Sequence, residues 1–256
     1  MKKTYRRTIL FLILGLLLFT AGAAVAQWFE EKLPPLSPPS QYGNIMINRI
    51  SDKSDMLPVG FSHWMHRSKH TCRVCHTELE FEMKVNTTEI TMEKINQGQY
   101  CGACHDGNKA FGTEECKKCH NGNIDYGSDK FRKLASALPK TEFGNKIDWA
   151  FAYKKKMIKP KRTIRPGEYT PETFKKFLTL EAEWANIPPA IFPHDQHIVW
   201  LDCANCHPDI FNIKKKTTKH FLMKYMLEGK FCGACHLNVA FPLDDCKRCH
   251  PAISSR

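Results

Sequence analysis

Twelve cysteines, arranged as six copies of one five-residue motif, constrain this 256-residue chain more than any other feature. Each copy reads C-x-x-C-H, and together the copies use every cysteine in the sequence. On one helical turn, positions i, i+3 and i+4 share a face, so we expect both thiols and the imidazole of each motif to point the same way. The motifs occupy residues 72–76, 101–105, 116–120, 203–207, 232–236 and 246–250.

This spacing is typical of covalent c-type haem attachment, in which two cysteines form thioether bonds and the adjacent histidine binds the iron. We therefore predict six haem c groups, one for each motif. The attaching residues are Cys72, Cys75, Cys101, Cys104, Cys116, Cys119, Cys203, Cys206, Cys232, Cys235, Cys246 and Cys249. The proximal iron ligands are His76, His105, His120, His207, His236 and His250.

Two other uses of paired cysteines compete with haem attachment. Zinc sites also use C-x-x-C units, but they do not need a histidine directly after every second cysteine. Exported chains rich in cysteine are often disulfide scaffolds, yet C-x-x-C is the spacing of redox-active pairs rather than of structural disulfides. The histidines therefore favour haem over both alternatives.

The N-terminus predicts export. A basic opening precedes an uncharged apolar run, Ile9 to Ala26, which ends in the small-x-small sequence Ala24-Val25-Ala26. This is the pattern of a cleaved signal peptide, residues 1–26, although the run is also just long enough for an uncleaved membrane anchor. Either outcome leaves the haem motifs outside the cytoplasmic membrane, so we expect a periplasmic protein, with membrane-anchored or extracellular locations as alternatives.

The net charge of +12 does not indicate nucleic-acid binding. Loss of the signal removes four basic residues, which leaves about +8. The propionates of six haems would bring the holoprotein to roughly +2 when oxidised and about −4 when reduced. The basic excess thus mostly balances the cofactor, and we predict no nucleic-acid partner.

The motifs lie in two copies of a three-haem unit. Phe61-Ser-His63-x-x-His66 matches Phe192-Pro-His194-x-x-His197, and the first two motifs recur at an offset of 131 residues and the third at 130. Such a fixed offset indicates an internal duplication. We predict a signal at 1–26, an extended N-terminal segment at 27–60, modules at 61–120 and 191–256, and a linker at 121–190.

Two features lie outside these motifs. Tyr42-Gly43-Asn44 is echoed by Phe143-Gly144-Asn145, and the linker carries a basic run and a candidate helix. Thr170 can cap that helix and Pro171 suits its first position, with Phe174, Phe177 and Leu178 on one face. The basic run is either a docking patch for an acidic partner or, as we favour, a solvated linker. It comprises Lys154, Lys155, Lys156, Lys159, Lys161, Arg162 and Arg165.

About 230 mature residues are too few to build a conventional core around each of six haems, so the haems must form the interior. The predicted fold is a multihaem c-type cytochrome of mainly short α-helices and irregular loops wrapped around haems, with little β-structure and two tandem triheme modules.

The H-x-x-H pairs supply four candidate distal ligands, His63, His66, His194 and His197, one helical turn apart within each pair. For the third haem of each module we predict Met92 and Met223, which align between the copies and carry a soft thioether. A buried methionine that merely packs beside a haem is the alternative. His220 is the rival ligand for the last haem, whereas His70 lies too close to Cys72 to reach another haem.

Each module resembles the triheme domain of the cytochrome c7 type, within the wider cytochrome c3-like superfamily. The resemblance rests on the F-x-H-x-x-H opening, the three C-x-x-C-H motifs and the run from Met92 or Met223 to Cys-Gly-Ala-Cys-His. It implies a periplasmic or extracellular electron carrier in which the first histidine of each H-x-x-H pair serves the first haem of its module and the second histidine serves the second haem. Small family members use a histidine at the third haem, and fused triheme domains can use methionine.

We therefore expect a hexahaem electron carrier rather than an enzyme. Its partners would be other redox proteins, such as membrane quinol-linked, periplasmic or outer-surface cytochromes. One alternative is a multihaem reductase, for example of nitrite, which needs an open iron. Another is a structural subunit of an extracellular cytochrome assembly. An uncleaved N-terminus would add membrane association.

Overall fold

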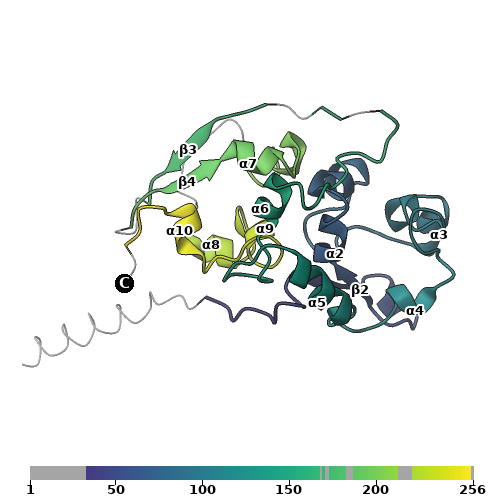
Figure 1. Cartoon of the computed structure of the whole chain (residues 1–256). Coiled ribbons are helices and arrows are strands. Elements are labelled where there is room, and N and C mark those ends of the chain that lie inside the picture. The colour runs from purple at the N-terminus through teal and green to yellow at the C-terminus, as the bar shows by residue number, and fades with distance from the viewer. Residues whose placement is uncertain (1–32, 168, 171–172, 183–186, 213–220, 255–256) are drawn as a thin grey trace, which may run out of the picture. The chain divides into compact units, whose positions relative to one another are not determined.

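The computed structural model describes residues 33–254 apart from 168, 171–172, 183–186 and 213–220 (Figure 1). The predicted signal and the rival ligand His220 lie outside the described residues. Within them the longest helix is α5 (Ser128–Ala137), with 10 residues, and the strands form two two-stranded sheets. This confirms the predicted fold of short helices and loops with little β-structure. None of the helices in the described ranges has the length and apolar character needed to cross a membrane.

A hairpin leads into the first module. Strand β1 (Asn44–Ile47) pairs antiparallel with β2 (Val59–Ser62) in a register that sets Asn44 opposite Ser62. Strand β2 runs directly into α2 (His63–Arg67), so the F-x-H-x-x-H sequence spans a strand end and a helix. The remaining elements are η1 (Ser51–Lys53), the π-helical turn η2 (Val74–Glu78), α3 (Met92–Asn96), the 3-10 turn η3 (Tyr100–Ala103) and α4 (Cys116–Cys119).

The second module repeats this plan. Strand β3 (Phe177–Leu180) pairs antiparallel with β4 (Ala190–Pro193), and β4 runs directly into α7 (His194–Ile198). The helical turns that follow are η4 (Cys203–Asn205), α8 (Met223–Leu227), α9 (Gly233–His236) and α10 (Cys246–Cys249). The duplication predicted from the motifs is therefore present in the backbone.

The helix predicted after Thr170 is wrong over residues 173–180, whereas its proposed first residue, Pro171, lies outside the described residues. Residues Phe177–Leu180 form strand β3, and their exposure alternates along the strand with a period of two residues. The apolar residues that suggested a helical face therefore belong to a strand. A short isolated helix is marginal, whereas β4 supplies this segment with backbone hydrogen-bond partners.

The echo between residues 42–44 and 143–145 does not mark equivalent positions. The carbonyl of Gly43 receives a hydrogen bond from the first histidine of α2, and the carbonyl of Lys176 does the same for α7. Lys176, and not Gly144, is therefore the structural counterpart of Gly43. Residues 143–145 instead lie in a turn beside Tyr42, because a Cβ on Gly144 would come 3.3 Å from the Tyr42 ring.

Much of the apolar core comes from the segment predicted to be a plain linker. Helices α5 and α6 (Trp149–Lys154) supply it together with the stretch between and after them, and Trp64 of α2 is the member from the first module. The buried members are Trp64, Phe131, Leu138, Ile147, Trp149, Ala152 and Ile158. The basic side chains that follow α6 are mostly exposed as expected, but Ile158 and Pro160 are buried and anchor that stretch.

Candidate haem-attachment sites

Each C-x-x-C-H motif forms the helical turn that its spacing predicts. In five motifs the amide of the histidine donates to the carbonyl of the first cysteine, at 2.8 to 2.9 Å. These bonds close the turns at His105, His120, His207, His236 and His250. The remaining motif, 72–76, lies in the helical segment that becomes η2. None of the twelve cysteines is in a disulfide, so every motif keeps both sulfurs for attachment.

Ten histidines each form the same kind of hydrogen bond, between a ring nitrogen and a backbone carbonyl. In each, Nδ1 lies 2.6 to 3.1 Å from a backbone carbonyl oxygen. In the H-x-x-H pairs the bonds join His63 to Gly43, His66 to Ser62, His194 to Lys176 and His197 to Pro193. In the motifs they join His76 to Phe81, His105 to Phe111, His120 to Leu57, His207 to Phe211, His236 to Phe241 and His250 to Pro188.

This shared bond selects the tautomer that a metal needs. A carbonyl oxygen only accepts, so Nδ1 must carry the proton and Nε2 keeps its lone pair free. Metal-bound histidines commonly donate their second ring nitrogen in this way, which fixes the ring and raises its basicity. His70 differs, because its Nδ1 is buried and has no hydrogen-bond partner among the described residues. The ten histidines that share the bond are the six proximal and four distal candidates of the sequence.

Burial keeps several of these rings neutral. It lowers the pKa of His63 to about 3 and the pKa of His66 to about 4, even though their carbonyl bonds act in the opposite direction. In the second module burial lowers the pKa of His236 to about 4. Only the neutral imidazole can bind a metal, so these side chains are in the ligating form at neutral pH.

One imidazole pair has the same geometry in both modules. The ring centroids of His66 and His105 lie 6.3 Å apart, and those of His197 and His236 lie 6.1 Å apart. Since a metal–imidazole bond is about 2.0–2.1 Å, two rings on opposite sides of one metal have centroids roughly 6 Å apart. These spacings fit two axial ligands of one iron. They also match the resemblance, which assigns the second histidine of each H-x-x-H pair to the second haem.

The phenylalanine that opens each F-x-H-x-x-H sequence positions these rings. Phe61 stacks on His66 at a centroid distance of 4.4 Å, and Phe192 stacks on His197 at 4.3 Å. The same phenylalanines meet the first histidine of each pair edge to face, at 4.9 and 4.8 Å. The side chain therefore fixes both rings of the pair in both modules.

Met92 and Met223 occupy equivalent positions, although the described contacts do not place either sulfur opposite a third motif. They are the first residues of α3 and α8, which are both five residues long. Each helix is followed by a motif glycine that touches it. A Cβ on Gly102 would lie 1.9 Å from the carbonyl oxygen of Ile95, and a Cβ on Gly233 would lie 1.9 Å from that of Met226. The glycine of each Cys-Gly-Ala-Cys-His sequence thus allows the helix to pack directly on the motif.

A zinc site of the usual kind has no counterpart in the described ranges, where no three His, Cys, Asp or Glu side chains converge. The donors instead come as two thiols and one imidazole on each turn, and in two cases a second imidazole lies 6.1 to 6.3 Å away, centroid to centroid. Two sulfurs on one side and nitrogen ligands across a gap are what a covalently attached haem requires. The residues present fit that group.

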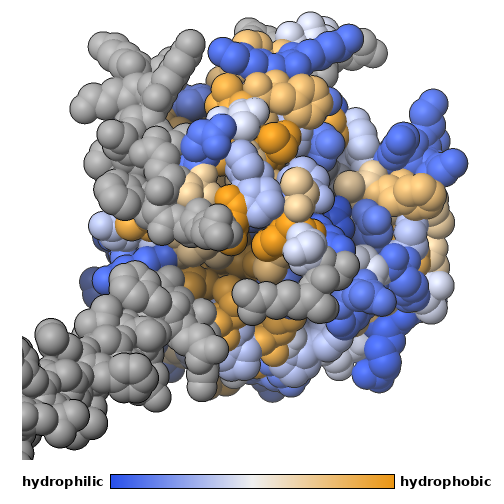
Figure 2. All heavy atoms as spheres, turned by 90° about the vertical axis from the view of Figure 1, so that its left-hand side faces the viewer, coloured by the Kyte–Doolittle hydropathy of each residue, from blue (hydrophilic) through white to orange (hydrophobic). Residues whose placement is uncertain are grey.

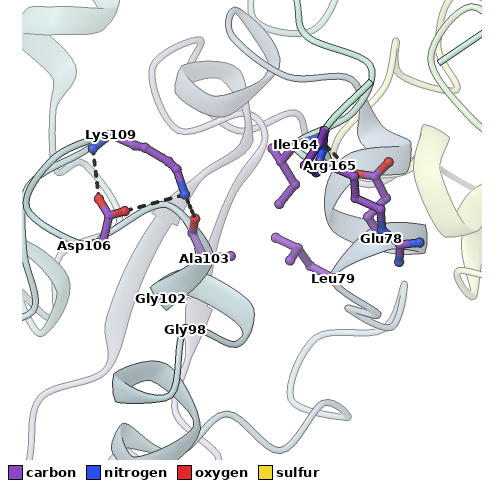
Figure 3. A pocket seen from close by; sticks show the side chains of 10 residues that line it. Glu78, Leu79, Gly98, Gly102, Ala103, Asp106, Lys109, Ile164 and Arg165 are labelled. Atoms are coloured by element: carbon purple, nitrogen blue, oxygen red, sulfur yellow. Dashed lines mark hydrogen bonds and ion pairs between the residues drawn. The ribbon is translucent and has the colours of Figure 1, made fainter. Parts of the chain in front are cut away.

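A cavity lies behind the second motif (Figure 3). It is lined by Gly102 and Ala103, the two residues between the cysteines, and on the other side by Leu79, Ile164 and Arg165 among others. Its lysine, Lys109, is paired with Asp106 at 3.5 Å and donates to the Ala103 carbonyl at 2.8 Å. Lys109 is therefore engaged within the protein rather than held free for an anionic substrate.

Apolar side chains also reach the surface. Figure 2 shows them, in orange, between hydrophilic side chains on the face that includes β3, β4 and α10. Phe177 is 56% exposed and Phe174 is 47% exposed, and the Phe174 ring lies 4.9 Å from that of His194. This face of the second module thus brings aromatic side chains next to a candidate ligand.

Comparison with known proteins decides the family. Residues 59–121 and 190–251 each match the sequence model of cytochrome c7 and related cytochrome c. The chain belongs to the cytochrome c7 family. It is therefore a multihaem c-type cytochrome of a family that binds haem covalently and functions in haem-based electron transfer.

Several solved structures are similar to this cytochrome. A c7-type three-haem cytochrome domain is 32% identical over 34% of this chain and 94% of that chain, with a TM-score of 0.27. The C-terminal hexahaem fragment of GSU1996 is 25% identical over 86% of this chain and 99% of that chain, with a TM-score of 0.27. The dodecahaem cytochrome c GSU1996 is 25% identical over 83% of this chain and 75% of that chain, with a TM-score of 0.28. No protein with a curated description matches significantly.

Sequence reasoning missed the carbonyls that orient the proximal histidines. Two of them lie far along the chain, since His120 reaches Leu57 and His250 reaches Pro188. A signal existed, because Pro58 and Pro189 align in the two copies and show that the repeat extends to the N-terminal side of Phe61 and Phe192. That extension carries the residues that fix the third proximal ring of each module.

Proposed function

We propose that this cytochrome is an exported hexahaem electron carrier, with one haem on each of its six C-x-x-C-H motifs. The observation that carries the proposal is the recurrence of one arrangement in both modules: a pair of imidazoles with ring centroids 6.1 to 6.3 Å apart, whose Nδ1 atoms both donate to backbone carbonyls. An iron held between two such rings has no open position for a substrate.

The proposed axial ligands follow from these positions. In each module the motif histidine is proximal, and the H-x-x-H pair supplies the distal ligands of the first two haems. The distal histidines are His63, His66, His194 and His197. Met92 and Met223 are the proposed distal ligands of the third haems, with His220 as the rival for the last one.

A bound haem supplies one-electron exchange at its iron. The chain contributes position and environment. The cysteines fix each attachment point, the carbonyl bonds hold the imidazoles in one tautomer and orientation, and the stacked phenylalanines exclude water from the rings. Methionine ligation would give the third site of each module a higher potential than a bis-histidine site.

The location and partners belong to the same proposal. The N-terminal pattern supports export to the periplasm, with membrane-anchored or extracellular forms as alternatives. Other redox proteins would be the partners. The exposed cations after α6 support docking of an acidic one, because buried Ile158 and Pro160 anchor their backbone. Raising the salt concentration should then slow electron exchange with such a partner.

Two measurements test the carrier. Mass spectrometry of the purified protein should count six attached haems, one for each motif. Carbon monoxide added to the freshly reduced protein should leave its absorbance unchanged, because every iron is already six-coordinate. Rapid stoichiometric binding would reveal an open iron and replace the carrier with a reductase.

The methionine ligands have their own test. Met92→Ala and Met223→Ala should each convert one ferric haem from low spin to high spin, seen in the absorption and electron paramagnetic resonance spectra. Met157→Ala is the matched control, because Met157 is 51% exposed and lies outside both modules. A wholly low-spin spectrum for Met92→Ala would show that this methionine is not a ligand.

A further inference from the structure

The loop that follows the fifth motif orients the proximal histidine of that motif. His236 Nδ1 lies 3.0 Å from the carbonyl oxygen of Phe241, so this carbonyl fixes the ring only while the loop keeps its shape. Within the loop, the amides of Val239 and Ala240 donate to the Cys235 carbonyl at 3.1 and 2.7 Å. The loop therefore folds back onto the motif and brings Phe241 to the ligand.

Two side chains from outside the second module hold this loop. The Tyr42 hydroxyl donates to the Ala240 carbonyl at 2.7 Å, and Arg67 Nη2 donates to the Val239 carbonyl at 2.8 Å. These carbonyls belong to the two residues directly before Phe241. Both residues are thus bonded twice, through their amides to the motif and through their carbonyls to the distant side chains.

The two donors are themselves held by packing. Tyr42 is 4% exposed, and a Cβ on Gly144 would lie 3.3 Å from its ring and 3.2 Å from Pro242, the residue that follows the loop. Arg67 is the last residue of α2, and its guanidinium lies 5.5 Å from the centroid of the Trp149 ring, which belongs to the apolar core. The donors are therefore fixed by buried residues, and the loop is fixed by the donors.

The first module closes the equivalent loop, after the second motif, from within (Figure 3). Asp106 Oδ1 accepts hydrogen bonds from the amides of Asn108 and Lys109, both at 2.9 Å, and Lys109 Nζ donates to the Ala103 carbonyl at 2.8 Å. The second loop is one residue shorter, which shifts the repeat offset from 131 to 130, and it has Leu237 where the first has Asp106. It therefore lacks the carboxylate that closes the first loop.

We infer that Tyr42 and Arg67 are positioning residues for His236. They hold, from outside the module, the loop whose Phe241 carbonyl orients this proximal ligand, and they take the place of the internal closure by Asp106. The inference rests on the proposed function, since it requires a haem on the fifth motif. The hydrogen bond to the second ring nitrogen of an axial imidazole fixes the ring and tunes the iron. The fifth haem site thus depends on residues that precede the second module.

Tyr42→Phe tests the inference without changing any charge. It removes the hydroxyl and keeps the ring that packs against Gly144. In the full-length ferric holoprotein, nuclear magnetic resonance resolves the shifted methyl signals of each haem, and their pattern depends on the orientation of the axial imidazoles. The largest change among the haems should occur at the fifth motif. No change there, or an equal or larger change at another haem, would overturn the inference.

Further variants give the rescue and the matched controls. Arg67→Met removes the donor and should change the same signals, whereas Arg67→Lys keeps a donor for the Val239 carbonyl and should restore most of the original pattern. Asp106→Ala opens the other loop and should change the second haem most, and a second haem that stays unchanged would overturn the comparison of the two loops. Tyr126→Phe removes a hydroxyl that forms none of these contacts and should leave the fifth haem unchanged.

General loosening of the two modules is the competing explanation, and a second contact between them separates it. Arg73, between the cysteines of the first motif, is 9% exposed at its side chain and pairs at 3.2 Å with Asp202, directly before the fourth motif. Asp202→Asn weakens that contact and should change the fifth haem less than Tyr42→Phe does. Equal changes at the fifth haem would overturn the inference while the carrier stands. A haem count below six, or carbon monoxide binding to the unaltered protein, would instead refute the proposed function.

Discussion

The distal helices α2 and α7 carry the same ligand spacing in opposite surroundings. Between its two histidines α2 has Trp64 and Met65, and Trp64 is 2% exposed in the apolar core. At the same positions α7 has Asp195 and Gln196, which are half-buried and exposed. The ligand set is therefore independent of what packs behind the helix, and the module environment is set by the intervening residues.

The third motifs also differ in burial, but here the second module has the more buried residues. Asp245, directly before the last motif, is 7% exposed and pairs with Arg248 at 2.6 Å. The counterpart pair in the first module, Glu115 and Lys118, is exposed on both sides. Each basic residue also lies over a phenylalanine, Lys118 at 4.9 Å from Phe111 and Arg248 at 5.0 Å from Phe241. The first module thus packs on an apolar core at its start, and the second has the more buried ion pair at its third motif.

The two distal helices therefore differ in how closely water can approach their candidate ligands. The core behind α2 shields His63 and His66 on that side, while no such core backs α7 in the described residues. Solvent exposure and nearby charge are among the main influences on haem potential. Two modules with the same proposed ligands can therefore differ in potential.

The largest expected effect is a loss of unfolding free energy on mutation of α2 that has no counterpart in α7. Trp64→Ala should lower the free energy of unfolding by about 3–5 kcal/mol, because it removes a large buried ring from the core. Asp195→Ala, at the equivalent place in α7, should change it by less than about 0.5 kcal/mol. Guanidinium unfolding followed at the haem absorbance measures both. Equal losses would show that the core does not distinguish the modules.

An intermediate loss of unfolding free energy should be similar in the two modules. Gly102→Ala and Gly233→Ala would each press a Cβ against a backbone carbonyl, at 1.9 Å before adjustment. Each should cost about 1–3 kcal/mol of unfolding free energy in the same denaturant assay. Gly112→Ala is the control, since it would meet only the movable carboxylate of Glu114. A large loss in just one module would mean that the helix–motif contact is not a common feature.

The smallest expected effect is a loss of unfolding free energy that is greater in the second module than in the first. Asp245→Asn should cost about 1 kcal/mol, because it weakens a charged hydrogen bond whose acceptor, Asp245, is largely buried. Glu115→Gln, in the exposed pair, should cost less than about 0.5 kcal/mol. Both are measured by the same unfolding experiment, with Asp129→Asn on α5 as an exposed control. If Glu115→Gln proves the more costly, the second module does not depend on its ion pair.

The sequence predicted the parts of the site that depend on local spacing. The helical turns at the motifs and the equivalence of Met92 and Met223 follow from residues a few positions apart. The prediction failed where partners are distant. Residues Phe177–Leu180 were assigned to a helix because Phe174, Phe177 and Leu178 fit a helical face, but pairing with β4 makes them a strand. Similarly, Leu57 and Pro188 lie 63 and 62 residues from the third proximal histidines that they orient, and the aligned Pro58 and Pro189 marked only an extension of the repeat.

By itself, then, the sequence determined the cofactor chemistry and the duplication, because thioether attachment and axial ligation require fixed residue types at fixed short spacings. The tertiary structure alone decided which segment forms the core, which carbonyl orients each imidazole, and that Arg67 and Arg73 link the two modules. Those outcomes depend on burial and on hydrogen bonds between residues up to 198 positions apart, as for Tyr42 and Ala240. Such contacts form only when the whole chain folds, so no local pattern can encode them.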